Sequence, residues 1–191
     1  MRKLLLTGAA LGVLFSAAEA GAVVVTLSDL GGASSFVPSS FGSSGPVTLS
    51  WSNISYWAPS QYSGSPAAWC TGGQSVACTI SITVASGGSV TIDSLQFGGY
   101  LNAARTIAVS LTDLTSNSQV FSSTASPTSN TLATLSPNKT STTGFTLGWG
   151  PDGYNGGLVS LTYSFTRPSE TTPMPEPATM ALLGAGLLGL G

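Results

Sequence analysis

The sequence predicts an all-β protein: an antiparallel β-sandwich or jelly roll of about nine strands, flanked by an N-terminal signal peptide and a short C-terminal hydrophobic helix. Three observations predict this class. Apolar residues recur at every second position in several segments, as Ile80, Ile82 and Val84 do between Thr and Ser. Turn-forming residues separate these segments, and no segment between the two ends has a helical period. Each strand would have one face buried in the core and one face exposed to solvent, which indicates antiparallel sheets packed on each other.

The expected strands are rich in Val, Ile, Thr and aromatic residues. In chain order they cover residues 22–29, 46–57, 76–85, 89–97, 105–114, 119–123, 131–135, 144–149 and 158–166. The period of two recurs in 107–111 and in 161–165. Short hairpin connections are expected at 86–88 and 115–118, where Gly, Ser and Asn favour turns.

The N-terminus predicts a signal peptide over residues 1–20. A short basic start is followed by an apolar stretch over 4–15, and Ala18 and Ala20 then form an A-x-A cleavage pattern. We expect cleavage after Ala20, with cleavage after Ala22 as the alternative. A short transmembrane anchor is a second interpretation, but the apolar stretch falls well below the roughly 20 residues needed to span a bilayer.

The body between the two ends, residues 21–170, has the length of one domain. It carries three basic and five acidic residues, so its net charge is 3 − 5 = −2. So few basic residues cannot form the positive stripe that phosphate contacts require, which excludes nucleic acid as a partner. The chain has no histidine, the usual general base and zinc ligand. We therefore expect no enzyme, no cofactor and no metal site.

Side chains with carboxylate or amide oxygens offer two candidate kinds of site. Asp29, Asp152 and Asn155 offer oxygen ligands of the kind that calcium prefers, but Asp-Gly and Asn-Gly are also ordinary turn pairs. Asp93 and Asp113 are carboxylates that a glycosidase could use, although nothing in their sequence context brings them together. The turn interpretation is the stronger one for the first set.

The two cysteines, Cys70 and Cys78, predict a disulfide, because an even cysteine count behind a signal peptide is typical of an oxidising compartment. A metal site built from two thiols is the weaker alternative. Trp51, Tyr56, Trp57, Tyr62 and Trp69 precede Cys70 closely in the sequence.

Within that aromatic group, Tyr62 and Trp69 fall in an expected loop over 58–71 and are candidates for contact with carbohydrate, since exposed aromatic faces stack on sugar rings. Trp51 and Trp57 are six residues apart and would share one face of a regular strand. For these two tryptophans we expect places in the core.

The C-terminal residues carry a specific resemblance. Residues 171–191 comprise a Pro- and Thr-rich tether, then Pro175-Glu176-Pro177, then the uncharged apolar run 178–191. This pattern resembles the PEP-CTERM sorting signal of Gram-negative bacteria, which an exosortase recognises. As a helix, the apolar run would cover about 21 Å, less than the ~30 Å hydrocarbon core, so it indicates a sorting signal and not a stable anchor.

A second resemblance concerns the body. Segments 92–97, 107–111, 145–149 and 154–165 resemble the jelly-roll body common in PEP-CTERM proteins, which is similar to carbohydrate-binding modules. The resemblances together imply a non-catalytic exported protein that is held transiently in the inner membrane, cut by an exosortase, and released to the cell surface or the extracellular matrix, where it is associated with exopolysaccharide. The alternative is a carbohydrate-binding module that uses the aromatic residues near the disulfide.

Overall fold

The computed structural model describes residues 20–73 and 75–168. Ala20 is its first residue; the rest of the predicted signal peptide, including Ala18, lies outside the described residues. So do the tether and the sorting motif Pro175-Glu176-Pro177. The described part is all-β, as predicted, and no helix in it has the length and apolar character needed to cross a bilayer.

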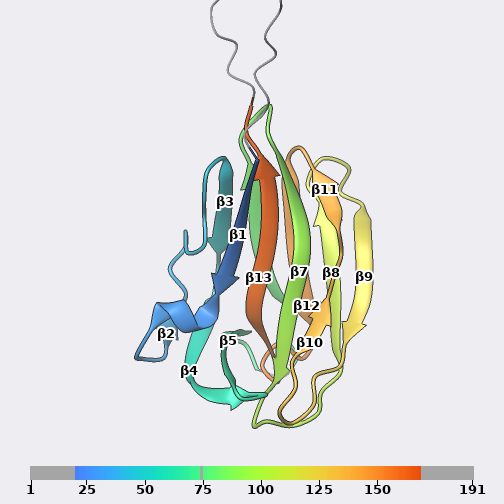
Figure 1. The fold of residues 1–191 in the computed structure, drawn as a ribbon. Helices are drawn as coiled ribbons and strands as arrows, with labels where there is room; N and C mark the ends of the chain where they lie inside the picture. The colour runs from blue at the N-terminus through green and yellow to red at the C-terminus, as the bar shows by residue number, and fades with distance from the viewer. Residues whose placement is uncertain (1–19, 74, 169–191) are drawn as a thin grey trace, which may run out of the picture. The chain divides into compact units, whose positions relative to one another are not determined.

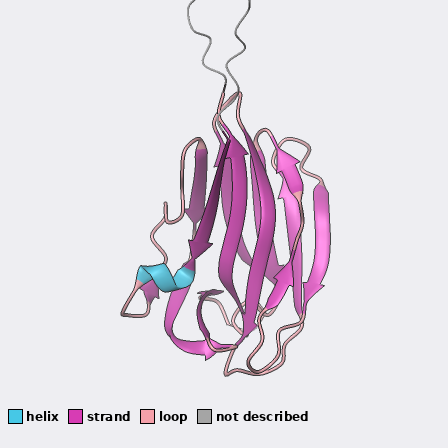
Figure 2. Cartoon of the chain, in the orientation of Figure 1, coloured by secondary structure: helices cyan, strands magenta, loops and turns pink. Residues whose placement is uncertain are grey.

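The described chain forms thirteen strands and one turn of 3-10 helix (Figures 1 and 2). The strands are β1 (Ala20–Thr26), β2 (Ser35–Phe36), β3 (Val47–Trp51), β4 (Ile54–Tyr62), β5 (Ser65–Cys70), β6 (Cys78–Val84), β7 (Ser89–Gly99), β8 (Ile107–Asp113), β9 (Gln119–Ala125), β10 (Ala133–Leu135), β11 (Lys139–Ser141), β12 (Gly144–Gly150) and β13 (Gly156–Thr166), and the helical turn η1 covers Leu27–Leu30. The sequence did not predict β2, β5 and β11.

All strand pairs described are antiparallel, as predicted, and they build two sheets. The larger sheet has the order β10-β7-β13-β5-β4-β2, with β1 added to β13 and β11 added to β7. The smaller sheet has the order β3-β6-β12-β8-β9. Buried side chains of both sheets belong to one hydrophobic core, so the sheets pack face to face.

The period of two gives β6 and β8 their core faces. Ile80 and Ile82 of β6 are buried, whereas Thr79 and Thr83 on either side of them are exposed. Leu147 of β12 pairs with Ile80 on one side and with Leu111 of β8 on the other, so three apolar residues form a row across the smaller sheet. Such rows form only if the register holds, because a shift by one residue would turn each strand's apolar side chains toward solvent.

The prediction of a single strand over 46–57 is wrong, because the chain turns in the middle of this segment. Asn53 adopts a positive φ of 55° between β3 and β4, and the two strands belong to different sheets. Trp51 ends β3 and is buried, with its Nε1 donating to Phe41 O at 2.8 Å. Trp57 lies on β4 and is half-buried. The two tryptophans therefore share no strand face.

The loop expected over 58–71 is also wrong. Most of it is a hairpin of β4 and β5, in which Tyr62 pairs with Ser65. Ser63 and Gly64 form the two-residue turn with φ values of 49° and 84°. A positive φ at both positions is the signature of a type I′ turn, whose twist matches that of the flanking strands.

Candidate functional site

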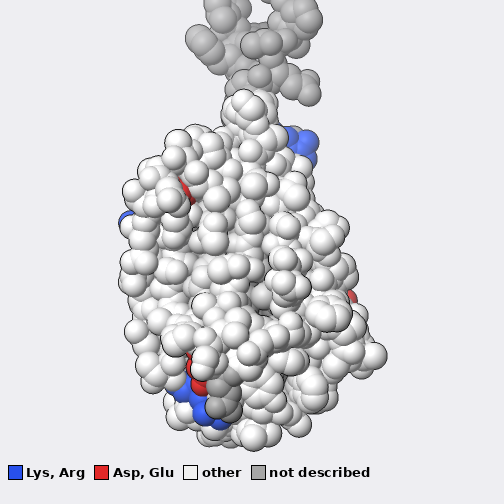
Figure 3. Space-filling view, turned by 180° about the vertical axis from the view of Figure 1, so that it is seen from behind, with Lys and Arg blue, Asp and Glu red and all other residues white. Residues whose placement is uncertain are grey.

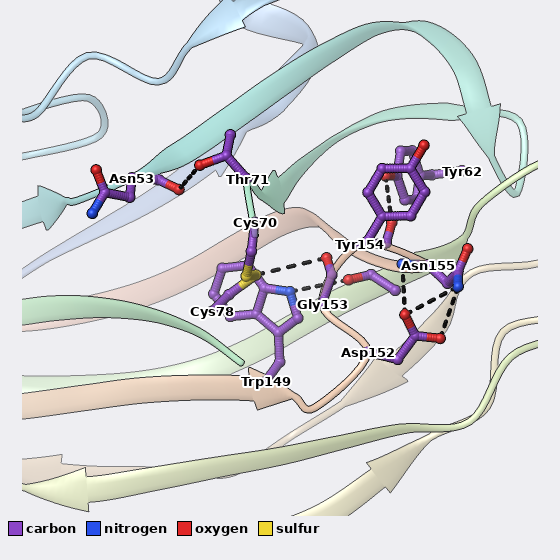
Figure 4. The surroundings of a disulfide bond; sticks show 11 residues. Asn53, Tyr62, Cys70, Thr71, Cys78, Trp149, Asp152, Gly153, Tyr154 and Asn155 are labelled. Carbon is purple, nitrogen blue, oxygen red and sulfur yellow. Dashed lines mark hydrogen bonds between the residues drawn. A yellow bond between two sulfur atoms is a disulfide. The ribbon is translucent and has the colours of Figure 1, made fainter. Parts of the chain in front are cut away.

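Cys70 and Cys78 form a disulfide, as the sequence predicts, with their Cα atoms 5.4 Å apart (Figure 4). Cys70 ends β5 in the larger sheet and Cys78 begins β6 in the smaller sheet. Both residues are buried. The bond therefore links the two sheets at one edge of the common core.

Gly153 packs directly against this disulfide (Figure 4). A Cβ atom at this position would lie 2.6 Å from Cys78 Sγ and 2.7 Å from Cys70 Sγ, so only glycine fits without a shift of the sulfur atoms. The Gly153 carbonyl accepts a hydrogen bond from Cys70 N at 3.3 Å, and its N–H donates to Val76 O at 3.1 Å. The disulfide thus positions the segment that leads into β13.

Tyr62, a predicted carbohydrate contact, is only 1% exposed, so its ring cannot stack on a sugar. Its ring fills space left by glycines: Gly157 of β13 pairs with Gly98 of β7, and a Cβ at Gly157 would lie 2.8 Å from Tyr62 Cδ1. The Tyr62 hydroxyl donates to Tyr154 O at 2.8 Å, and burial raises the pKa of Tyr62. The sequence does not show this place, because Gly98 and Gly157 become partners only through the pairing of β7 with β13.

Trp69 lies on β5, next to β4, and packs together with Trp57 against a second buried cluster of Tyr62, Ala67 and Val159. Phe36 pairs with Ser55, and Ser55 pairs with Trp69, so these three residues form a row across the strands. Trp57 lies two residues beyond Ser55 and joins the same side. The opposite side of the hairpin carries residues of the main core, so this row lies on the side of the sheet away from that core. We call Phe36, Trp57 and Trp69 the aromatic face.

The aromatic face borders an uncharged hollow of about 230 Å³. Phe36 is 67% exposed, and Trp57 and Trp69 are half-buried. Ser34, Ser35 and Ser55 also line the hollow. Aromatic rings beside hydroxyl groups match the two surfaces of a sugar ring, its C–H face and its polar edge.

Two contacts hold the tryptophan rings in place. The indole N–H of Trp57 donates to Gln61 Oε1 at 3.2 Å. Trp69 meets Tyr154 edge to face, with ring centroids 5.0 Å apart and an interplanar angle of 86°. Because these two rings are already fixed, they lose little conformational entropy when a ligand binds to them, which favours binding.

Two of the described carboxylates, those of Asp93 and Asp113, accept hydrogen bonds from neighbouring residues. Asp113 accepts a hydrogen bond from Ser141 Oγ at 2.6 Å, and this bond, together with those from residues 115–116, lowers the pKa of Asp113 to about 2. Asp93 accepts from Ser164 Oγ at 3.3 Å. Within residues 20–73 and 75–168, no three His, Cys, Asp or Glu side chains group as metal ligands.

Comparison of the chain with protein-family models, with curated proteins and with solved structures finds no match. Function has to be inferred from the residues of this chain. Of the two predicted carbohydrate contacts, Trp69 lies on the aromatic face and Tyr62 does not. Phe36, the most exposed ring of this face, was not predicted, because the two-residue strand that carries it is too short to show a period.

Proposed function

We propose that this chain is a non-catalytic exported protein of a Gram-negative bacterium, with a jelly-roll-like body, sorted through a PEP-CTERM tail to the cell surface or the extracellular matrix. The observation that carries the proposal is Pro175-Glu176-Pro177 directly before the uncharged apolar run 178–191. The absence of histidine from the chain supports a non-catalytic role.

In this proposal, the signal peptide directs export and the C-terminal apolar run holds the chain transiently in the inner membrane. An exosortase cuts near Pro175-Glu176-Pro177 and releases the body. The pairing of Ala20 with Thr166 supports this order of events, because the chain enters and leaves the body at the same end. Removal of both terminal segments would then leave β7, β8 and the rest of the core intact.

The surface of the body supports association with exopolysaccharide. The face drawn in Figure 3 is almost entirely uncharged. Ser, Thr, Asn and Gly supply the polarity of the chain, and only 6% of its residues are charged. A surface rich in hydroxyl and amide groups can exchange its hydrogen bonds with water for hydrogen bonds with sugar hydroxyls at little electrostatic cost.

Mass spectrometry of the mature C-terminus tests the sorting step. We expect surface protein that ends near residues 175–177, and we expect it to be lost in a strain that lacks the exosortase. A variant in which Glu176 is replaced by Ala should accumulate in the membrane fraction. Surface protein that still carries Gly191 would contradict the cleavage step.

A second candidate function is carbohydrate binding by the aromatic face. The observation that favours it is the row of Phe36, Ser55 and Trp69 beside the hollow, with Trp57 next to it. Phe36→Ala and Trp57→Ala should each weaken retention on an exopolysaccharide affinity gel several-fold, since each removes a stacking surface. Val24→Ala is the matched control, because Val24 is 64% exposed and lies outside this face. Equal retention of all three variants would contradict this function.

A further inference from the structure

A larger hollow, of about 470 Å³, lies at the end of the body opposite Ala20 and Thr166. It forms where β8 and β13 begin, at Ile107 and Gly156. Residues 104–106 and 126–128, together with Asp152 and Asn155, meet around it from three separate loops. We call it the end pocket, and neither the sorting tail nor the aromatic face involves it.

The walls of the end pocket are held by hydrogen bonds between the loops. Arg105 N donates to Pro127 O at 3.1 Å, and Tyr100 N donates to Asn155 O at 2.8 Å. The buried Ser63 hydroxyl donates to Thr128 O at 2.6 Å. The pocket is therefore formed before a ligand arrives, so a ligand would not have to order the loops.

The guanidinium of Arg105 has unused hydrogen-bonding capacity. A guanidinium has five N–H donors, and within the described part of the chain this one forms a single hydrogen bond, from Nη2 to Tyr100 O at the long distance of 3.5 Å. Its Nε is buried without a hydrogen-bond partner among the described residues. A poorly satisfied donor of this kind gains more from a new acceptor than a donor that is already paired.

The carboxylate of Asp152 lines the same pocket and is almost fully used. It accepts hydrogen bonds from Asn155 N at 3.3 Å and from Asn155 Nδ2 at 3.0 and 2.9 Å. A carboxylate has about four lone-pair sites, so about one acceptor site is left on Asp152. The N–H groups of Asn155 occupy the other acceptor sites. Asp152 and Asn155 therefore stabilise the turn over residues 153–155, which agrees with the turn interpretation of these two residues.

Two side chains of opposite charge, Arg105 and Asp152, therefore line the same preformed pocket. Arg105 has hydrogen-bond donors left, and Asp152 has an acceptor site left. A singly charged ligand would be attracted by one of the two side chains and repelled by the other, so the two effects oppose each other. A hydroxyl group can both accept from Arg105 and donate to Asp152. Thr106, Ser126 and Thr128 add hydroxyls to the lining.

We propose that the end pocket binds a neutral sugar unit, with adjacent hydroxyls that accept from Arg105 and donate to Asp152. This inference rests on the proposed association with exopolysaccharide only for the source of the sugar. It assigns to the body a binding site at the end remote from Thr166, the last residue of β13.

Titration of the full chain, observed by amide NMR, tests the proposal. The probes are the methyl glycosides of glucose, galactose and mannose, with glucuronate and glucosamine as charged probes. We expect saturable shifts at the amides of Thr106, Thr128 and Asn155 with at least one neutral glycoside, and weaker binding of both charged probes. The proposal is overturned if no neutral glycoside gives saturable shifts up to about 100 mM, or if glucuronate binds more tightly than every neutral glycoside.

Variants test the assignment to Arg105 and Asp152. Arg105→Gln should weaken binding about tenfold or more, because it removes a charged donor, and its amide spectrum reports whether the fold is kept. Lys139→Gln is the matched control, since Lys139 is exposed and pairs with Ile92 on β7, outside the pocket. Wild-type affinity in a folded Arg105→Gln protein, or shifts confined to Phe36 and Trp69, would overturn the end-pocket site. Neither result bears on the C-terminal cleavage, which mass spectrometry tests independently.

Discussion

Ala20, the first residue of β1, pairs with Thr166, the last residue of β13. The last strand of the body is also its most connected one, because β13 pairs with β7 on one side and with β1 and β5 on the other. The larger sheet therefore cannot be completed until the chain is available through Thr166. In an exported protein, this places the completion of folding after translocation of nearly the whole body.

The first prediction concerns the N-terminus of the mature protein. Cleavage after Ala20 keeps six of the seven β1–β13 pairs, and cleavage after Ala22 keeps only four. Gly21 also lies under the ring of Phe165, which would lose this contact with the second cut. We expect N-terminal sequencing of the exported protein to begin at Gly21. A protein that begins at Val23 would show that the end of β1 is dispensable.

The second prediction concerns the disulfide. Replacing Cys70 and Cys78 together by Ser should lower the free energy of unfolding by about 2–3 kcal/mol, because the bond closes a short loop in the unfolded chain. For a protein of this size, the change corresponds to a fall in Tm of roughly 5–10 °C. Thermal unfolding of the wild-type protein and the double variant measures it. Reducing agent should lower the Tm of the wild-type protein only, and equal Tm values without reducing agent would contradict the prediction.

The third prediction separates Tyr62 from carbohydrate binding. Tyr62→Phe removes the hydrogen bond to Tyr154 O and leaves that carbonyl without this donor. We expect a loss of about 1 kcal/mol in the free energy of unfolding, measured by urea denaturation, and no change in retention on the polysaccharide gel. Weaker retention with unchanged stability would show that Tyr62 acts on a ligand.

The fourth prediction concerns pH. Because the pKa of Asp113 falls from 3.8 to about 2 on folding, the unfolded chain binds more protons between these values. The stabilisation from ionised Asp113 is therefore complete above pH 3.8 and is lost as the pH falls toward 2. Asp113→Asn should be less stable than the wild-type protein at pH 7, and the difference should shrink over this window. A difference that stays constant from pH 7 to pH 2 would contradict the role of the carboxylate charge.

Several parts of this structure could be predicted from local pattern. The strands around Ile80 and Leu111 follow from the alternation of apolar and polar residues, because such a strand has one apolar face that it can bury. The disulfide between Cys70 and Cys78 follows from the even cysteine count and from the predicted signal peptide, which is typical of proteins in an oxidising compartment. The division of 46–57 into β3 and β4 was missed, because it depends on a single residue, Asn53, in a left-handed conformation.

The candidate sites were harder to predict. Trp69 was recognised as a candidate contact, but its neighbours Phe36 and Trp57 reach it only through the pairing of three strands. The end pocket combines Arg105 with Asp152, which are far apart in the sequence. No local pattern indicates that the loops carrying them meet.

The sequence by itself determined the all-β class, the antiparallel pairing, the disulfide and the sparse charge of this protein. These properties depend on residue type and on spacing within one segment, which remain the same wherever the segment lies. Only the tertiary structure decided that Tyr62 is buried over paired glycines, that Phe36 and Trp69 share one face, and that Ala20 meets Thr166. Those relationships arise from which strands become neighbours, and that choice depends on the whole core rather than on any one strand.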